Sequence, residues 1–232
     1  MTYVLDRSRR ARSLRSVASE RTYLPAMRFK ALTPFFDTFV AVGVRERTLK
    51  ARLLDQVELP PGASVLDVGA GTGTLAIQMK ERWPDARVTG LDADPQILAI
   101  ARRKASEAGA EIDFVEGFSN ELPFEDASFD AVVSTLFFHH LNRDAKRATL
   151  SELARVLKPG GGLHIGDYGK GADPLQRAAF GAVRGFDGFA VTADNARGRF
   201  PAMVEDAGFE PVEVRGRLRT PLGTMDLIHA KR

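Results

Sequence analysis

The chain has 232 residues, of which 44% are apolar and 27% are charged, and its formal net charge is +3. A chain of this size buries one sizeable core, and it holds no apolar run near the roughly 20 residues that a membrane-spanning helix needs. It contains no cysteine, which excludes disulfide bonds, thiolate catalysis and cysteine-ligated metal sites. The composition therefore indicates a soluble globular protein.

The positive charge is concentrated at the N-terminus. Residues 1–30 hold eight Lys/Arg against two acidic residues, so the rest of the chain is net negative. This distribution predicts a solvated basic arm over residues 1–30 and one folded domain over residues 31–232; contact of the arm with a phosphate-rich partner or an acidic membrane is the alternative. The body gives no reason to expect nucleic acid as a partner. The absence of an apolar leader segment favours the cytoplasm, against a weak likeness to a transit peptide.

Turn residues divide the chain into alternating helical and extended segments. Thr33-Pro34 is typical of a helix start, and this first helix is predicted to run to about Val57. Later helices are predicted over 73–82, from Asp94 to Gly109, and over 143–157. Strands are predicted over 64–68, 87–92, 111–115, 129–134 and 162–167. The alternation predicts an α/β fold, a Rossmann-like doubly wound sheet that is mostly parallel, with helices on both faces.

After residue 170 the pattern changes. Residues 171–200 carry Phe180, Phe186 and Phe189 among glycines, which predicts a lid over an apolar ligand; an amphipathic helix that buries the three rings is the alternative. A helix over about 197–207 is followed by two alternating segments joined by "PLGT". These two segments predict a C-terminal antiparallel hairpin.

Three glycines follow the first predicted strand, in "SVLDVGAGTGTL". A glycine-rich turn at the end of such a strand lies where open parallel sheets bind ligands. Gly69, Gly71 and Gly73 form G-x-G-x-G, and Thr74 stands where a dinucleotide-binding loop has its third glycine. No Gly-Lys-Ser/Thr follows, so the turn is not a Walker loop either. The spacing therefore disfavours NAD, FAD and nucleoside triphosphates.

Two acidic residues flank this turn. Asp92 ends the next predicted strand, nineteen positions after Gly73, where a carboxylate accepts both hydroxyls of a ribose. Asp67 precedes the turn, where a carboxylate meets a ligand ammonium directly or through water. Each acid alone is unspecific, but together with the turn they predict a nucleoside ligand.

With these motifs the chain resembles the class I, seven-strand S-adenosylmethionine-dependent methyltransferases, in particular the small-molecule branch that includes the ubiquinone/menaquinone-biosynthesis enzymes. The resemblance covers about residues 33–168 and is carried by "VLDVGAGTGTL", "VTGLDADPQILAIAR", "LPFEDASFDAVVS" and "ELARVLKPGGGLHIGD". It implies transfer of a methyl group from S-adenosylmethionine to a small-molecule acceptor by in-line displacement. The cofactor-binding residues expected from it are Asp67, Gly69, Ala70, Gly71, Gly73, Asp92, Ala93, Phe118, Ser119 and Thr135.

One position departs from the family pattern. The family typically has an acid after the third strand, in a "GDA" motif, which accepts a hydrogen bond from the adenine amino group; this sequence has Gly117-Phe118-Ser119. Phe118 packs against a purine but accepts no hydrogen bond, so backbone groups of Phe118 and Ser119 are the expected substitutes. The missing bond is worth only about 1 kcal/mol, so cofactor binding is still expected.

The segment "STLFFHHLNRD" follows the fourth predicted strand and supplies the candidate catalytic residues. His139 and His140 are placed near the mouth of the site, and either is a candidate general base for a hydroxyl or ammonium acceptor; a capping or packing role is the alternative. Asp167 and Tyr168 end the fifth strand and are candidate acceptor contacts. The acidic cluster of magnesium-dependent catechol enzymes is absent, so no metal is expected.

Two other functions compete with methyl transfer. A non-catalytic S-adenosylmethionine-binding module keeps the motifs without turnover, and an NAD-dependent oxidoreductase keeps the fold but is disfavoured by Thr74. The glycine and phenylalanine content of residues 171–200 favours an apolar or aromatic acceptor. The sequence assigns no oligomeric state.

Overall fold

The structure, a computed structural model, describes residues 45–232. The basic arm over residues 1–30 and the start of the first helix at Thr33-Pro34 lie outside the described residues. Within residues 45–232, no helix has the length and apolar content that crossing a membrane requires.

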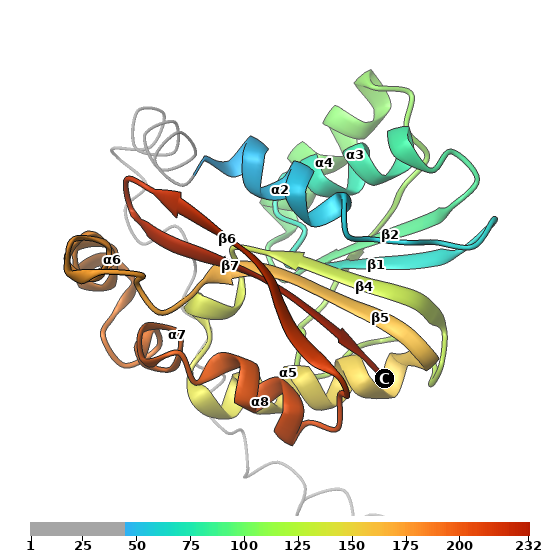
Figure 1. Cartoon of the computed structure of the whole chain (residues 1–232). Helices are drawn as coiled ribbons and strands as arrows, with labels where there is room; N and C mark the ends of the chain where they lie inside the picture. Colours follow the sequence, from blue (N-terminus) through green and yellow to red (C-terminus); the bar gives the residue numbers. More distant parts are fainter. Residues whose placement is uncertain (1–44) are drawn as a thin grey trace, which may run out of the picture. The chain divides into compact units, whose positions relative to one another are not determined.

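The described residues are organised around a seven-stranded sheet in the order β3-β2-β1-β4-β5-β7-β6 (Figure 1). All neighbouring pairs from β3 to β5 are parallel, whereas β7 is antiparallel to both β5 and β6. The strands are β1 (Ser64–Val68), β2 (Arg87–Asp92), β3 (Asp113–Glu116), β4 (Phe129–Thr135), β5 (Leu157–Tyr168), β6 (Val212–Thr220) and β7 (Gly223–Lys231). This arrangement confirms the predicted doubly wound sheet and its C-terminal antiparallel hairpin.

Helices cover both faces of the sheet (Figure 1). On one face lie α2 (Glu46–Leu54), α3 (Thr74–Arg82) and α4 (Pro95–Glu107); on the other lie α5 (Arg143–Val156) and α8 (Phe200–Asp206). The 3-10 helix η1 (Phe138–His140) follows β4, and α6 (Pro174–Asp187) and α7 (Ala193–Arg197) follow β5.

Alternation along each strand divides the core between the two faces. On β1, Val65 packs in the layer that contains α2, α3 and α4, while Leu66 packs in the layer that contains α5 and α8. Both side chains are fully buried, and burial of an aliphatic side chain of this size contributes roughly 2 kcal/mol. Asp67, next along β1, therefore faces the α2–α3–α4 layer.

Capping residues fix where the helices begin. Asp94 precedes Pro95, and its carboxylate accepts from the backbone N–H of Gln96 at 2.8 Å. Asn142 caps α5 in the same way, accepting from the Ala145 N–H at 2.8 Å. These side chains satisfy N–H groups that have no partner inside the helix, which is why these starts were predictable from the sequence.

Three boundaries differ from the prediction. The helix predicted to run to about Val57 is not continuous through Arg45, which has φ 54°, and α2 ends at Leu54. β5 starts at Leu157 instead of residue 162, because Leu157 already pairs with Phe129 of β4 and the glycine run bonds to Arg232, whose carbonyl oxygen accepts from the Gly160 N–H at 2.9 Å. The helix predicted over 197–207 is divided, because Gly198 has φ +69° and ends α7, and α8 then starts at Phe200.

Candidate functional site

The candidate site lies at the carboxyl ends of the parallel strands. The strand order reverses between β1 and β4, and ligands of open α/β sheets bind at such a point. Asp92 ends β2, Thr135 ends β4, and Asp167 lies next to the end of β5. The topology thus gathers at one edge residues that are up to 75 positions apart in the sequence.

The three loop glycines have different structural roles. A Cβ on Gly69 would lie 2.4 Å from the Phe137 ring, and one on Gly73 would lie 2.9 Å from the Phe114 ring. A Cβ on Gly71 would meet no atom within 4 Å among the described residues, although its φ of +54° still favours glycine. Gly69 and Gly73 therefore allow close packing of the loop, while Gly71 leaves open space beside its backbone.

Asp67 is a buried carboxylate that the described residues do not satisfy. It is 1% exposed, and its Oδ2 has no hydrogen-bond partner among residues 45–232. Burial raises the pKa of Asp67 to about 7, although the nearby Lys50 ammonium opposes the shift. A cationic ligand group beside Oδ2 would restore its ionised form.

Asp92 is held in place by backbone donors. Its Oδ2 accepts from the Gly71 N–H at 2.9 Å, and its Oδ1 accepts from the Asp94 N–H at 3.0 Å. These bonds fix the carboxylate beside the open space at Gly71. Since each carboxylate oxygen has two lone pairs, Asp92 retains capacity to accept from ligand hydroxyls.

The segment after β3 reaches the same edge, because the Gly117 N–H donates to the Asp92 carbonyl oxygen at 3.0 Å. Phe118 is 36% exposed there. The Ser119 hydroxyl instead forms a buried hydrogen bond with the Thr149 hydroxyl at 2.8 Å. Of these two residues, Phe118 offers side-chain surface to a ligand, and any contact through Ser119 would use its backbone.

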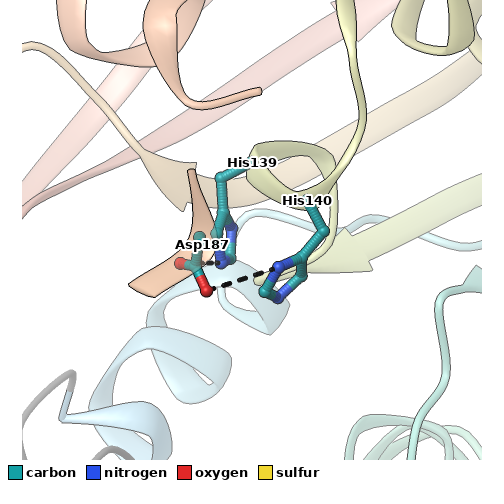
Figure 2. Close-up of side chains that lie close together, drawn as sticks. All are labelled: His139, His140 and Asp187. Atoms are coloured by element: carbon teal, nitrogen blue, oxygen red, sulfur yellow. Dashed lines mark ion pairs between the residues drawn. The ribbon is translucent and has the colours of Figure 1, made fainter. Parts of the chain in front are cut away.

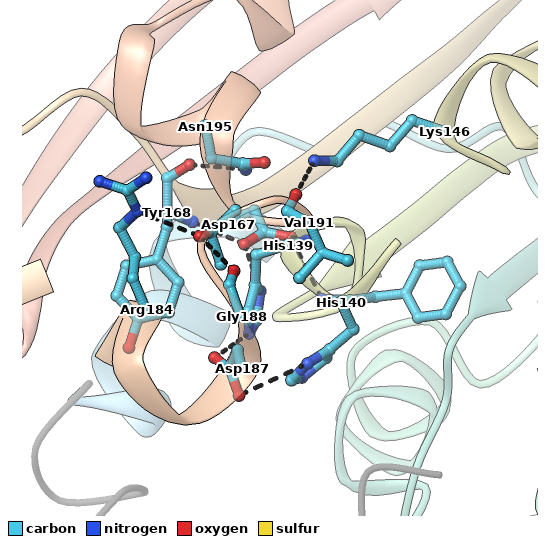
Figure 3. A network of polar contacts seen from close by, with 12 residues as sticks. His139, His140, Lys146, Asp167, Tyr168, Arg184, Asp187, Gly188, Val191 and Asn195 are labelled. Carbon is cyan, nitrogen blue, oxygen red and sulfur yellow. Dashed lines mark hydrogen bonds and ion pairs between the residues drawn. The ribbon is translucent and has the colours of Figure 1, made fainter. Parts of the chain in front are cut away.

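The two histidines form η1, directly after β4. His139 is buried, and its Nδ1 lies 2.7 Å from Asp167 Oδ1. Asp167 Oδ2 also accepts from the backbone N–H groups of Phe137 and His139, each at 3.2 Å (Figure 3). Burial acts to raise the pKa of Asp167, but the charge and hydrogen bonds of His139 and its neighbours outweigh it, so the pKa lies below its ordinary value. Asp167 is therefore an ionised partner that fixes the His139 ring.

A third acidic residue, Asp187, approaches the histidines from the end of α6. Its Oδ2 lies 3.8 Å from His139 Nε2, and its Oδ1 lies 3.8 Å from His140 Nδ1 (Figure 2). Burial raises the pKa of Asp187, whereas burial and the neighbouring His139 lower the pKa of His140. The His140 side chain remains 39% exposed, so it is the more accessible of the two imidazoles.

Polar contacts tie the turn after α6 to the end of β5 and to α5 (Figure 3). Lys146 Nζ donates to the Val191 carbonyl oxygen at 2.6 Å, and Asn195 Nδ2 donates to the Tyr168 carbonyl oxygen at 2.9 Å. The Thr192 hydroxyl donates to the Gly188 carbonyl oxygen at 2.8 Å. These bonds hold the turn that follows Asp187.

The three phenylalanines of the segment 171–200 do not act as one group. Phe180 is buried and stacks on Tyr168, with ring centroids 4.3 Å apart, so it belongs to the core. Phe186 and Phe189 are 72% and 61% exposed. The helix that would bury all three rings is thus wrong for two of them. Whether the segment is a lid stays a prediction.

Sequence reasoning missed two residues of this site. In the sequence, Asp187 is only an acidic residue before Gly188, because its position beside the two histidines depends on where α6 ends. Lys50 is on α2, which packs against β5 and β7, and it carried no motif. All the cofactor residues expected from the sequence lie on the loops and strand ends at this edge, and their ligand contacts stay predictions.

Comparison with known proteins agrees with this geometry. Residues 65–161 match a family model described as a methyltransferase domain. A demethylmenaquinone methyltransferase of Thermus thermophilus is 45% identical over 119 residues, which are 51% of this chain and 51% of that protein. A demethylmenaquinone methyltransferase of Deinococcus radiodurans is 38% identical over 158 residues, which are 67% of this chain and 63% of that protein.

Solved structures give the same fold. A SAM-dependent methyltransferase from Aquifex aeolicus superposes with a TM-score of 0.62 at 20% identity, covering 84% of this chain and 97% of that one. A phosphoethanolamine N-methyltransferase of Haemonchus contortus, solved in complex with S-adenosyl-L-methionine, gives a TM-score of 0.60 at 26% identity, covering 72% of this chain and 37% of that one. The chain spans about half to two thirds of the length of the two curated relatives above.

Proposed function

We propose that this chain is a class I S-adenosylmethionine-dependent methyltransferase that transfers a methyl group from S-adenosylmethionine to a small-molecule acceptor by in-line displacement. The observation that carries the proposal is the pair of acids at the glycine loop. Asp67 is buried with an unsatisfied oxygen, and Asp92 is fixed beside the open space at Gly71. An ammonium and a ribose on one ligand match these two acids.

The residues present fit the cofactor part by part. Asp67 would hold its ammonium, the backbone at Gly71 its methionine portion, and Asp92 its ribose hydroxyls. Phe118 would pack against the adenine in place of the usual acid. The bound cofactor supplies a methyl group on a sulfonium, which needs alignment with the nucleophile more than it needs a dedicated catalytic group. Ala70, Gly69, Gly73, Ala93, Ser119 and Thr135 would line this part through loop and strand-end positions.

On the acceptor side, we assign His139 as the general base and His140 as its neighbour at the mouth. When His139 donates its Nδ1–H to Asp167, its Nε2 carries a lone pair. In the transfer, an acceptor hydroxyl gives its proton to Nε2 as its oxygen, or a ring carbon conjugated to it, forms the bond to the methyl carbon. The bound cofactor would supply the methyl group and keep the electron pair of the methyl–sulfur bond on sulfur. Asp167 stabilises the imidazolium that results.

We propose a quinone-type compound in its reduced, hydroxyl-bearing form as the acceptor. The curated relatives support this class, because they are named demethylmenaquinone methyltransferase or, in Brucella anthropi, ubiquinone/menaquinone biosynthesis C-methyltransferase. The exposed rings of Phe186 and Phe189 beside Asp187 suit an apolar acceptor. The cytoplasmic location expected from the sequence stays a prediction.

Cofactor titration and product analysis test the proposal. Calorimetry should detect S-adenosylmethionine binding to the wild-type chain, and Asp92→Ala should weaken it at least tenfold, because a fixed ribose acceptor is lost. Asp126→Asn, an exposed acid of the loop before β4, is the matched control. Incubation with reduced quinones and methyl-labelled cofactor should give a labelled product. Binding without any turnover would favour the non-catalytic module, and NADH binding in its place would favour the oxidoreductase.

A further inference from the structure

We propose that His139, His140 and Asp187 form a binding site for one divalent transition-metal ion of the zinc class. The ligand atoms that these three side chains offer lie within 4.8 Å of one another (Figure 2). Two imidazole nitrogens and one carboxylate are a donor set that zinc and related ions bind in proteins. The sequence led us to expect no metal, because the acidic cluster of magnesium-dependent catechol enzymes is absent, and Asp187 is 47 positions away from His140.

The two imidazoles are arranged as a pair although they are adjacent in sequence. Neighbouring residues on a regular helix point in different directions, but in η1 the two rings have centroids 3.9 Å apart. His139 Nε2 and His140 Nδ1 are each 3.8 Å from an oxygen of Asp187. Ligand atoms around a tetrahedral zinc ion are about 3.3 Å apart. Because the ligand atoms here lie within 4.8 Å of one another, closing the site requires the longest separation to shorten by up to about 1.5 Å.

Asp167 provides the hydrogen-bond partner that metal-bound histidines use for their second ring nitrogen. Metal-bound histidines commonly donate their second ring N–H to a carboxylate, which fixes the tautomer and the ring plane. Asp167 Oδ1 lies 2.7 Å from His139 Nδ1 and is itself held by backbone N–H groups, so Nε2 of His139 is aimed toward Asp187. The bonds around Val191, Thr192 and Asn195 in turn hold the chain that follows Asp187 (Figure 3).

An ion at this position has a defined relation to the transfer reaction. It takes the Nε2 lone pair of His139, which the proposed general base needs, so the metal-bound form lacks that base. Three protein ligands leave a further coordination position for water or an acceptor oxygen. The binding itself does not depend on the proposed function, because it requires neither cofactor nor acceptor.

The experiment is a metal titration of the full chain after treatment with a chelator. Calorimetry with Zn²⁺, and the visible absorption of bound Co²⁺, should show one ion per chain. Asp187→Asn should weaken Zn²⁺ binding at least tenfold, and Asp167→Asn should weaken it about 10–100-fold, as loss of an outer partner does. Asp55→Asn, a surface acid paired with Arg82, is the matched control and should bind like the wild type. Thermal unfolding and S-adenosylhomocysteine binding verify that each variant is folded.

A second histidine pair provides the decisive comparison. His164 on β5 and His229 on β7 are buried with their Nδ1 atoms 3.4 Å apart. Among residues 45–232, no third histidine or acidic side chain lies close enough to these two to complete a metal site. Ion binding that survives Asp187→Asn but disappears in His229→Gln would overturn the proposal, as would the absence of a one-to-one Zn²⁺ complex in the wild type. Loss in Asp187→Asn with retention in His229→Gln would support it.

Discussion

At the scale of single residues, the site depends on carboxylates whose surroundings differ. Asp67 is buried with an unsatisfied oxygen, Asp92 is fixed by two backbone N–H groups, and Asp167 is bonded to His139. The same side-chain type therefore suits three tasks: meeting a cation, accepting from hydroxyls, and orienting a ring. Desolvation that Lys50 offsets only in part sets Asp67 apart, since it raises the pKa of Asp67, while His139 lowers the pKa of Asp167.

The raised pKa of Asp67 predicts that cofactor affinity depends on pH. Burial raises the pKa of Asp67 from 3.8 to about 7, so the ligand-free folded chain keeps this carboxyl group protonated between these two pH values. The folded state therefore loses stability as the pH increases through this range. An ammonium ligand favours the carboxylate, so affinity should increase with pH, by up to about tenfold per unit below pH 7. Calorimetry between about pH 5.5 and 8.5 measures how the cofactor affinity depends on pH. The dependence should disappear in Asp67→Asn and persist in Asp126→Asn; equal slopes in both variants would refute the assignment.

His139 gives the second prediction at this scale. His139→Ala should lower kcat by about 10²-fold or more while cofactor affinity stays almost unchanged, because only the proton acceptor is lost. His140→Ala should have the smaller effect, since the carboxylate Asp167 orients His139 and not His140. Single-turnover rates separate the chemical step from product release. If His139→Ala and His140→Ala both react at the wild-type rate from about pH 6 to 9, the pair is structural and catalysis relies on alignment.

At the scale of elements, α6 connects the core to the acceptor side. Its Phe180 stacks on Tyr168 at the end of β5, while its last residue, Asp187, reaches the histidines of η1. The packing of one ring thus sets where the end of the helix lies. The hydrogen bonds of the turn after Gly188 then keep Phe189 beside Arg184, whose guanidinium carbon lies 4.9 Å from the centroid of that ring.

The exposed rings at this end of α6 predict a role in acceptor binding. The double substitution Phe186→Ser and Phe189→Ser should raise the KM for an apolar acceptor several-fold, because apolar contact area is lost, and should leave cofactor affinity unchanged. Leu175→Ser is the matched control, since Leu175 is 72% exposed at the other end of the helix. Steady-state kinetics at saturating cofactor measure the effect. An equal rise of KM in both variants would indicate that loss of apolar surface at either end of α6 has the same effect, so that Phe186 and Phe189 have no specific role.

At the scale of the whole molecule, one sheet edge collects the site. The reversal of strand order between β1 and β4 brings the glycine loop and Asp92 to one side, and η1 and Asp167 to the other. In-line transfer needs a donor and an acceptor held on opposite sides of one methyl group, and the cofactor and acceptor positions that we propose would meet this requirement. The antiparallel β7 extends the sheet beyond β5 and supports Tyr168 through its pairing with Met225.

The N-terminal arm gives a prediction at this scale. Deleting residues 2–28 should leave the unfolding temperature and the cofactor affinity nearly unchanged, because the residues that form the sheet and the cofactor side begin well after the arm. Thermal unfolding and calorimetry on the truncated chain measure both quantities. A truncated chain that is unfolded, or that no longer binds the cofactor, would show that the arm packs on the domain.

Local signals in the sequence determined most strands and most helix limits, and the cofactor-binding residues that the sequence indicated stay predictions. Asp94-Pro95 acts through backbone groups two and three positions away, so the start of α4 can be predicted without the fold. The bond from the Gly71 N–H to Asp92, by contrast, joins residues 21 positions apart. The glycine run after Lys158 was the exception, because hydrogen bonds to the distant Arg232 decide whether it is loop or strand. The acceptor side was decided only by tertiary structure. Asp187 meets His139 and His140 because α6 packs through Phe180 on β5, and such contacts between distant residues depend on packing, which leaves no local pattern in the sequence.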